Sequence, residues 1–174
     1  MAKTDSQPFQ IGNFVLRTRI LPAPLAGYSD RVFREICREF GCDLVYTEMA
    51  SAEGLIRSHD RTWNLLDTKG EPPPVGVQIF GRRVESMVRA AQMVQDSGAS
   101  LIDINAGCPM KKVVKNDAGA GLLDRPETLI SMVREMRKVL SIPLTVKLRS
   151  GTEKNPGAAS ELAPLLEAEG ADAL

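Results

Sequence analysis

The sequence predicts an α/β fold built on a parallel sheet. The main observation is a recurring order of elements: a short apolar run is followed by a longer segment whose apolar residues recur at helical spacing. A content of 43% hydrophobic and 25% charged residues is typical of a globular protein. The length of 174 residues suits one domain. A complete (β/α)8 barrel is longer, at about 250 residues.

The first expected elements are a hairpin, a strand and a helix. Residues 9–18 predict a small hairpin around Gly12-Asn13, a pair typical of turns. The first sheet strand is expected over residues 20–25, although its prolines are unusual inside a strand. Ser29 is expected to cap a helix that Gly41 ends. This helix should bury the apolar residues that share one face, which are Val32, Phe33, Ile36, Cys37 and Phe40.

The later elements continue the same alternation. Apolar runs predict further strands over residues 43–49, 75–80, 100–105 and 143–148. Helical spacing predicts helices over 51–57, 82–96 and 158–169, and one that begins at Pro126. Residues 59–74 should form a loop, and Pro164 predicts a kink or a late start in the last helix. Residues 171–174 resemble the opening of a sixth strand.

Composition excludes several classes of function. The formal net charge is zero, so any contact with RNA must come from a local basic patch. No apolar run approaches the roughly 20 residues of a membrane span. The three cysteines have no metal-type spacing and His59 is the only histidine, so we expect no metal site. A cytoplasmic, reduced protein that binds no membrane fits best, and its oligomeric state is left open.

Chemically useful residues lie where the predicted strands end. In parallel barrels the site is built at the C-terminal ends of the strands. A planar cofactor there would need small residues beneath it, an amide at its ring edge and a cation that supports negative charge. Small or reactive residues at the strand ends are Pro24, Ala26, Glu48, Gln78, Asn105, Lys147 and Arg149.

Cys108 lies in the loop after the strand expected over residues 100–105. Gly107 permits unusual backbone angles and Pro109 stiffens the exit, so the loop could aim the thiol into a cleft. A thiol is mostly protonated at neutral pH and can act as a general acid, or as a nucleophile once it loses its proton. Lys111 and Lys112 follow closely and could hold a phosphate backbone.

The string NAGCPMKKVVKNDAGAGLL closely resembles the tRNA-dihydrouridine synthases. The other blocks that carry this resemblance are APLAGYSDRVFR, TEM, VGVQIFG and VKLRSG. The resemblance runs from Ile20 to Leu174, which is most of the chain. A lone GCP would be a weak signal, whereas the set of blocks in this order is highly specific.

The resemblance implies a (β/α)8 TIM barrel that binds FMN, here truncated after about five βα units. NADPH reduces the flavin, which passes a hydride to C6 of a uridine flipped out of tRNA. The cysteine that matches Cys108 gives a proton to C5 from the opposite side. By position in the motifs, Pro24, Ala26, Gln78 and Lys147 should contact the flavin, and Asn105 and Arg149 should help to orient uracil.

The resemblance also implies parts that these residues do not contain. Family members carry a further histidine and arginine on the sixth strand, phosphate-binding loops at the end of the barrel, and a C-terminal helical domain that grips tRNA. We therefore expect residues 1–174 to be a partial FMN-binding TIM-barrel catalytic domain. The alternatives are another FMN TIM-barrel dehydrogenase that acts on a small molecule, and a catalytically inactive half-barrel that serves only as an interaction module.

Overall fold

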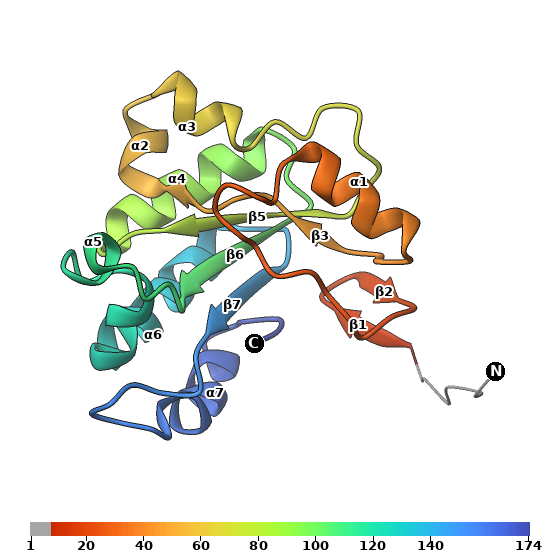
Figure 1. The fold of residues 1–174 in the computed structure, drawn as a ribbon. Helices are drawn as coiled ribbons and strands as arrows, with labels where there is room; N and C mark the ends of the chain where they lie inside the picture. The colour runs from red at the N-terminus through yellow and green to blue at the C-terminus, as the bar shows by residue number, and fades with distance from the viewer. Residues whose placement is uncertain (1–7) are drawn as a thin grey trace.

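A curled parallel sheet organises the chain (Figure 1), and the computed structural model describes residues 8–174. Its strands pair in the order β3-β5-β6-β7, and β4 also pairs with β5. The bounds are β3 Val45–Tyr46, β4 Ala50–Ser51, β5 Val75–Phe80, β6 Leu101–Ala106 and β7 Leu144–Leu148. Ala173 forms an isolated parallel bridge with Thr145, which confirms the expected opening of a sixth strand beside β7. The parallel α/β class is confirmed.

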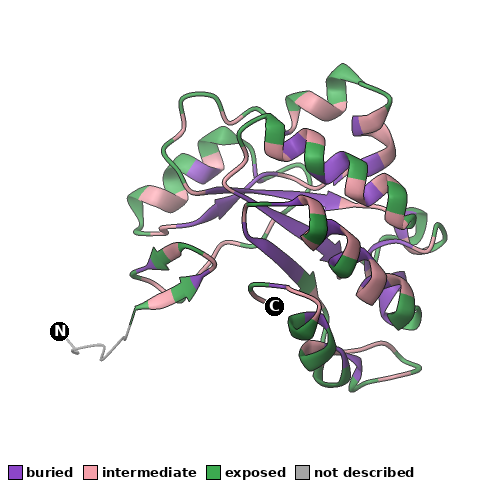
Figure 2. Ribbon diagram, turned by 180° about the vertical axis from the view of Figure 1, so that it is seen from behind, coloured by how far each residue is buried: buried purple, intermediate pink, exposed green. Residues whose placement is uncertain are grey.

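The helices connect the strands and cover the outer face of the sheet. They are α1 Arg31–Glu39, α2 Ala52–Ile56, α3 Asp60–Asn64, α4 Val84–Asp96, α5 Lys111–Val114, the 3-10 helix η1 Gly119–Asp124, α6 Pro126–Val139 and α7 Ala158–Ala168. α4 lies between α2 and α6 (Figure 1). Figure 2 shows buried residues along the strands and on the helix sides that face them. The main core joins these layers through residues such as Ile79, Met87, Ile104 and Met132.

A hairpin closes the N-terminal end of the sheet. β1 (Phe9–Ile11) pairs antiparallel with β2 (Phe14–Leu16), and Gly12 turns between them at a φ of 54°. Ile11 and Leu16 pack against Leu44 and Leu101, which lie where sheet strands begin. The predicted hairpin is therefore confirmed. Because it covers the beginnings of the strands, the opposite edge is left for a functional site.

Three expectations about local structure are wrong. Residues 20–25 form no strand, because Pro22 and Pro24 have no N–H to give to a ladder. The strand expected over 43–49 shrinks to β3, and the separate short strand β4 follows it. Between them the Glu48 carboxylate accepts a hydrogen bond from the backbone of Gly27. The loop expected over 59–74 contains α3, which is held by a hydrogen bond from Trp63 Nε1 to the carbonyl of Leu55 at 3.2 Å.

The last helix begins at the residue that the sequence predicts. α7 starts at Ala158 and carries Pro164 within it, so the late start is wrong. Pro164 has no N–H to donate to the carbonyl four residues earlier, at Ser160. Ser160 is exposed, so water can satisfy that carbonyl instead.

The orientation of α1 also differs from the prediction. Asp30, rather than Ser29, caps the helix, since its carboxylate accepts from the backbone of Phe33. The buried residue of α1 is Arg34, whose guanidinium bonds Glu71 and the carbonyls of Ser29 and Asp67. These bonds turn the polar side of α1 toward the loop before β5. Three residues of the face expected to be buried are therefore exposed: Val32, Ile36 and Phe40.

Candidate functional site

Polar side chains form a row across the inner face of the sheet. Gln78 on β5 is in register with Asp103 on β6, and Asp103 is in register with Thr145 on β7. Their apolar strand neighbours Ile79, Ile104 and Val146 belong to the core beneath the helices. Because side chains alternate along a strand, the three polar residues all point to the opposite face. Two residues further along, Asn105 and Lys147 form a second pair in register.

Asp103 is the centre of this row. One carboxylate oxygen accepts a hydrogen bond from Gln78 Nε2 at 2.6 Å, and the other accepts from the hydroxyl of Thr145 at 2.5 Å. Burial raises the pKa of Asp103 to about 6, while its two hydrogen bonds and the positive charge of Lys147 pull in the opposite direction. The site therefore contains a carboxyl group that titrates much closer to neutral pH than an exposed aspartate does.

A second set of hydrogen bonds joins this row to the Cys108 loop, the segment that follows β6 and carries Cys108. Asn105 Nδ2 donates to Gln78 Oε1 at 2.7 Å. The Asn105 side-chain oxygen accepts from the backbone N–H of Cys108 at 2.9 Å and of Gly107 at 3.2 Å. A continuous chain of hydrogen bonds thus runs from Thr145 through three side chains to the backbone that carries the thiol.

The Cys108 loop is held from its other side as well. Arg149 Nε donates to the carbonyl of Gly107 at 2.7 Å, and the backbone of Ala120 donates to the carbonyl of Cys108 at 3.0 Å. Gly119 has a φ of 57°, and a Cβ there would lie 2.7 Å from the Cys108 carbonyl oxygen. The sequence had indicated Gly107 as the position with unusual backbone angles, but in this segment the positive φ values are at Asp117 and Gly119. Cys108 itself is half-buried and forms no disulfide.

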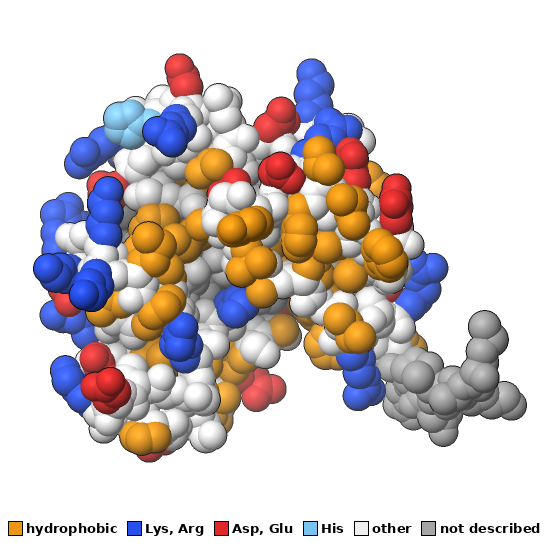
Figure 3. All heavy atoms as spheres, viewed as in Figure 1, with side chains coloured by type: hydrophobic (Ala, Val, Ile, Leu, Met, Phe, Trp, Pro, Cys, Tyr) orange, Lys and Arg blue, Asp and Glu red, His pale blue; other side chains and the backbone are white. Residues whose placement is uncertain are grey.

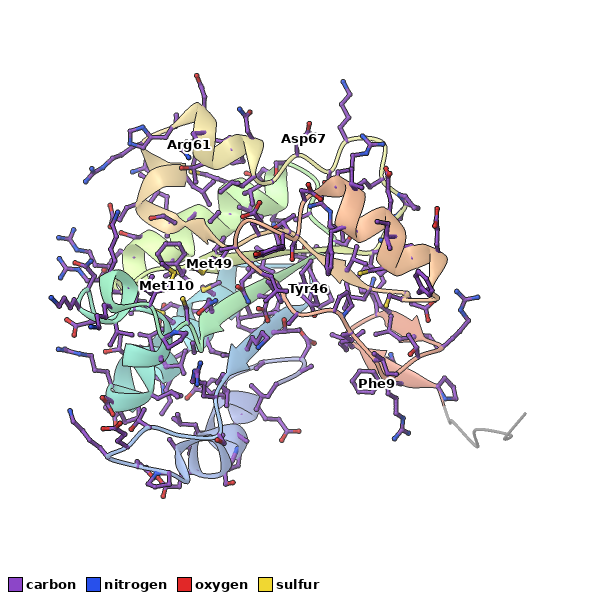
Figure 4. The ribbon with its side chains drawn as sticks, in the orientation of Figure 1. Phe9, Tyr46, Met49, Arg61, Asp67 and Met110 are labelled. Carbon is purple, nitrogen blue, oxygen red and sulfur yellow. The ribbon has the colours of Figure 1, made fainter. Side chains whose placement is uncertain are left out.

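The irregular segment after the hairpin lines two cavities, and the smaller of them also reaches Phe9 and Ile11 of the hairpin. Pro24 lines a cavity of about 210 Å³ together with Tyr46, Asp103 and Lys147. Ala26 lines a larger cavity of about 690 Å³ that includes Met49 and Met110. Figure 4 places Met49 and Met110 close together at the end of the sheet near α5, and places Tyr46 nearer its middle. The Cys108 loop contributes Met110 to the larger cavity, so the thiol lies on a segment that borders it.

The predicted flavin contacts have different degrees of exposure. Lys147 is exposed and forms no salt bridge with any residue of 8–174. Pro24 is half-buried and Ala26 is exposed, so both are accessible. Gln78 is only 1% exposed, and both atoms of its amide are already bonded within the protein. The structure thus brings Pro24 and Lys147 to one cavity, and joins Gln78 to the polar network instead.

The larger cavity has an apolar floor and a basic rim. Phe80, Met49 and Met110 are among its apolar lining residues. Its cations are Arg57, Arg82, Arg83 and Lys112, and its one carboxylate, Glu53, accepts from Ser86 Oγ at 2.6 Å. Figure 3 shows Lys and Arg side chains gathered over the side of the molecule where α5 lies. Lys111 is exposed beside this rim but does not line the cavity.

Sequence reasoning missed two groups of residues here. Asp103 and Thr145 interrupt strongly apolar strands at alternate positions, and that spacing could have assigned them to the inner face together with Gln78. Arg82 and Arg83 follow Gly81 just after the C-terminal end of β5, the place where parallel barrels present functional residues. Arg57 lies near them only through the fold and had no comparable signal.

Two further expectations concern metals and membranes. Among residues 8–174, no group of three or more His, Cys, Asp or Glu side chains is placed to hold a metal ion. Over the same range, no helix combines the length and the apolar character that crossing a membrane requires.

Comparison with known proteins identifies similar chains. A family model described as dihydrouridine synthase (Dus) matches residues 21–174. The tRNA-dihydrouridine synthase B of Klebsiella pneumoniae is 38% identical over 165 residues, which cover 95% of this chain and 51% of the relative. A probable tRNA-dihydrouridine synthase of Rhizobium leguminosarum bv. phaseoli is 37% identical over 155 residues, covering 89% of this chain and 49% of that protein. The chain therefore spans about half the length of the curated relatives that it matches.

A solved structure supports the fold. Histamine dehydrogenase from Rhizobium sp. 4-9 matches with a TM-score of 0.54 at 14% sequence identity, over 82% of this chain and 33% of that one. At this identity the likeness concerns the fold alone. Together with the curled parallel sheet, it confirms the (β/α)8-type fold predicted from the sequence.

Proposed function

Because the chain belongs to the dihydrouridine synthase family, we propose that residues 1–174 form part of an FMN-binding catalytic domain that reduces uridines in tRNA to 5,6-dihydrouridine. The observation that carries this proposal is the position of Cys108. Its loop lies at the C-terminal edge of the parallel sheet, borders a cavity of about 690 Å³ and is fixed by Asn105 and Arg149. A thiol held in this way can deliver a proton to a bound ring.

The residues at this edge fit a flavin. Lys147 is an exposed cation without a salt bridge in the described chain, and it lines a mainly apolar cavity with Pro24. The neighbouring backbone is open, because a Cβ added at Gly27 would meet nothing within 4 Å. Pro24 and Ala26 would underlie the ring, and Lys147 would balance its negative charge. Gln78 would reach the ring edge only with the second hydrogen of its amide, since the first is bonded to Asp103.

Bound FMN, reduced by NADPH, would supply the hydride that C6 of uracil receives. The protein's own part is to orient the base, to keep water away and to donate the second hydrogen. Cys108 would give its proton to C5, so that the C5–C6 double bond becomes a single bond. Asn105 and Arg149 would orient uracil indirectly, because both are bonded to the Cys108 loop.

The basic rim supports RNA as the substrate. Arg82, Arg83 and Lys112 are exposed around the larger cavity, and Lys111 lies beside them. Phosphate groups of a tRNA would be neutralised there while the target base leaves its stack. A dehydrogenase of small molecules would not need such a rim, and an inactive half-barrel would not need a constrained thiol. These two features favour tRNA uridine reduction over both alternatives.

The test is formation of dihydrouridine. The 174-residue protein is incubated with FMN, NADPH and an unmodified tRNA transcript, and the nucleosides are quantified by mass spectrometry after digestion. We expect dihydrouridine with tRNA and none with free uridine. Reduction of free uridine at an equal rate would favour a small-molecule enzyme, and no product despite bound flavin would contradict the proposed activity of these residues.

A further inference from the structure

The hydrogen-bond chain from Asp103 to the Cys108 loop contains two amides with a defined direction. A carboxamide has almost the same shape whichever way its oxygen and nitrogen lie, so only its bonding partners set its direction. Gln78 Nε2 donates to Asp103, and Gln78 Oε1 accepts from Asn105 Nδ2. The Asn105 side-chain oxygen in turn accepts from the N–H groups of Gly107 and Cys108.

Two sets of groups agree on this direction. At one end is the Asp103 carboxylate, and at the other are the Gly107 and Cys108 N–H groups together with Met49 Sδ, which lies 3.5 Å from Asn105 Nδ2. An ionised carboxylate only accepts hydrogen bonds, so Gln78 must present its nitrogen to Asp103. If Gln78 were reversed, two oxygens would face each other, and Asn105 would then have to turn its nitrogen toward the loop. That nitrogen cannot accept from the Cys108 N–H, so the bond that fixes the loop would be lost.

We propose that Asp103 is a positioning residue, whose carboxylate holds the Gln78 amide, and through it the Asn105 amide, in the direction that fixes the backbone carrying Cys108. This inference rests on the proposed function only for the role of the Cys108 thiol as proton donor. The geometric part, in which a buried carboxylate controls a loop through two intervening amides, stands without it.

The surroundings of Asp103 give it no simpler structural role. It is 3% exposed and has no salt bridge among the described residues. The titratable or charged groups near it are Tyr46 from β3 and Lys147 from β7, and its hydrogen-bond partners are Gln78 and Thr145. A carboxylate in such a place is costly in free energy, and an apolar residue of similar size would suit a purely structural position better.

The test compares three variants of the 174-residue protein by amide hydrogen exchange, measured by NMR. Asp103→Val fills the space without an acceptor, and Asp103→Asn keeps one oxygen for Gln78 if its nitrogen turns to the Thr145 hydroxyl. Thr145→Val is the matched control, because it removes the other partner of Asp103 and leaves the path to the loop intact.

For Asp103→Val we expect the Gly107 and Cys108 amides to exchange about fivefold faster, the factor that corresponds to losing one ordinary hydrogen bond. Exchange in Asp103→Asn and Thr145→Val should stay close to that of the wild type, so the conservative variant rescues the loop. Equal exchange in all three variants and the wild type would overturn the inference. So would equally faster exchange in Thr145→Val, since that would mean a general loosening.

A pH titration followed by NMR tests the same inference without any variant. In the wild-type protein, the Gly107 and Cys108 amide resonances should shift as Asp103 titrates, with a midpoint near pH 6. Resonances that stay constant between pH 5 and about 7.5 would contradict the inference even if the valine variant did not fold. A loop coupled to Asp103 in a protein that forms no dihydrouridine would support the positioning role and count against the proposed function alone.

Discussion

The side-chain oxygen of Asn105 lies 2.9 Å from the backbone nitrogen of Cys108 and accepts its hydrogen. This bond connects the end of β6 with the loop that follows, so the position of the thiol depends on the sheet. Because Asn105 is also bonded to Gln78, the loop is linked to β5 as well. The chemistry proposed for Cys108 therefore depends on the polar residues of the inner face.

Gly119→Ala should destabilise the protein more than the same change at another glycine with positive φ. At Gly119 a Cβ would lie 2.7 Å from the Cys108 carbonyl oxygen, whereas at Gly70, with a φ of +79°, it would meet nothing within 4 Å. Urea unfolding should show a loss of about 1 kcal/mol for Gly70→Ala and of about 3 kcal/mol for Gly119→Ala. Equal losses of unfolding free energy in the two variants would mean that the loop can shift to accommodate the added Cβ without an energetic penalty.

Ionisation of Asp103 should make the fold less stable as pH rises. Burial raises its pKa to about 6 from 3.8, so the native protein holds this proton more tightly than the unfolded chain does. Stability from this group is therefore lost between about pH 4 and about pH 6, and unfolding at pH 7 should need about 1 kcal/mol less than at pH 5. Other carboxylates also affect how stability depends on pH. The hydrogen bond from Arg17 lowers the pKa of Asp43, so ionisation of Asp43 stabilises the fold as pH rises.

The variant Asp103→Asn isolates that contribution. The difference in unfolding free energy between wild type and variant should change with pH by the amount expected for Asp103 alone. A difference that is constant from pH 4.5 to about 7.5 would show that Asp103 titrates at the pH of an ordinary aspartate.

Arg82→Ala combined with Arg83→Ala should weaken RNA binding and its dependence on salt. Each phosphate contact on a single strand contributes about 0.7 to the slope of log affinity against log salt, so losing two should reduce the slope by about 1.4. Fluorescence anisotropy with a labelled RNA oligonucleotide measures this. The matched control is Arg19→Ala with Lys69→Ala, which removes the same charge from exposed positions outside the cavity. An identical loss in both pairs would reflect net charge rather than a site.

Lys147→Met should weaken FMN binding by about tenfold, because a charge-assisted contact to the ring would be lost while most of the side chain's length is kept. A fluorescence titration of FMN measures the dissociation constant. Lys69→Met, at another exposed lysine, should leave it unchanged. If Lys147→Met bound FMN as tightly as the wild type, the proposed contact would have to be abandoned.

The sequence could predict most of the parallel sheet, because β5, β6 and β7 are predominantly apolar runs with polar residues only at alternate positions. It could not predict the shape of residues 20–25, where apolar composition favours a strand but the prolines prevent pairing. The sequence also predicted the wrong buried face for α1. The spacing of apolar residues identified one face, but it could not show that Arg34 would be buried in a salt bridge with Glu71. Motifs led to Cys108 and Lys147, whereas Asp103 acquires its role only through contacts with neighbouring strands.

The proton donation proposed for Cys108 can be tested in a single turnover. The protein is loaded with FMN, reduced without oxygen and mixed with unmodified tRNA, while flavin absorbance reports oxidation. We expect Cys108→Ala to bind FMN as the wild type does and to be oxidised by tRNA at least about 100-fold more slowly, the range typical of losing a general acid. Cys37→Ala, which removes a free thiol on α1, should react at the wild-type rate. Equal rates for Cys108→Ala and the wild type would contradict the role of Cys108.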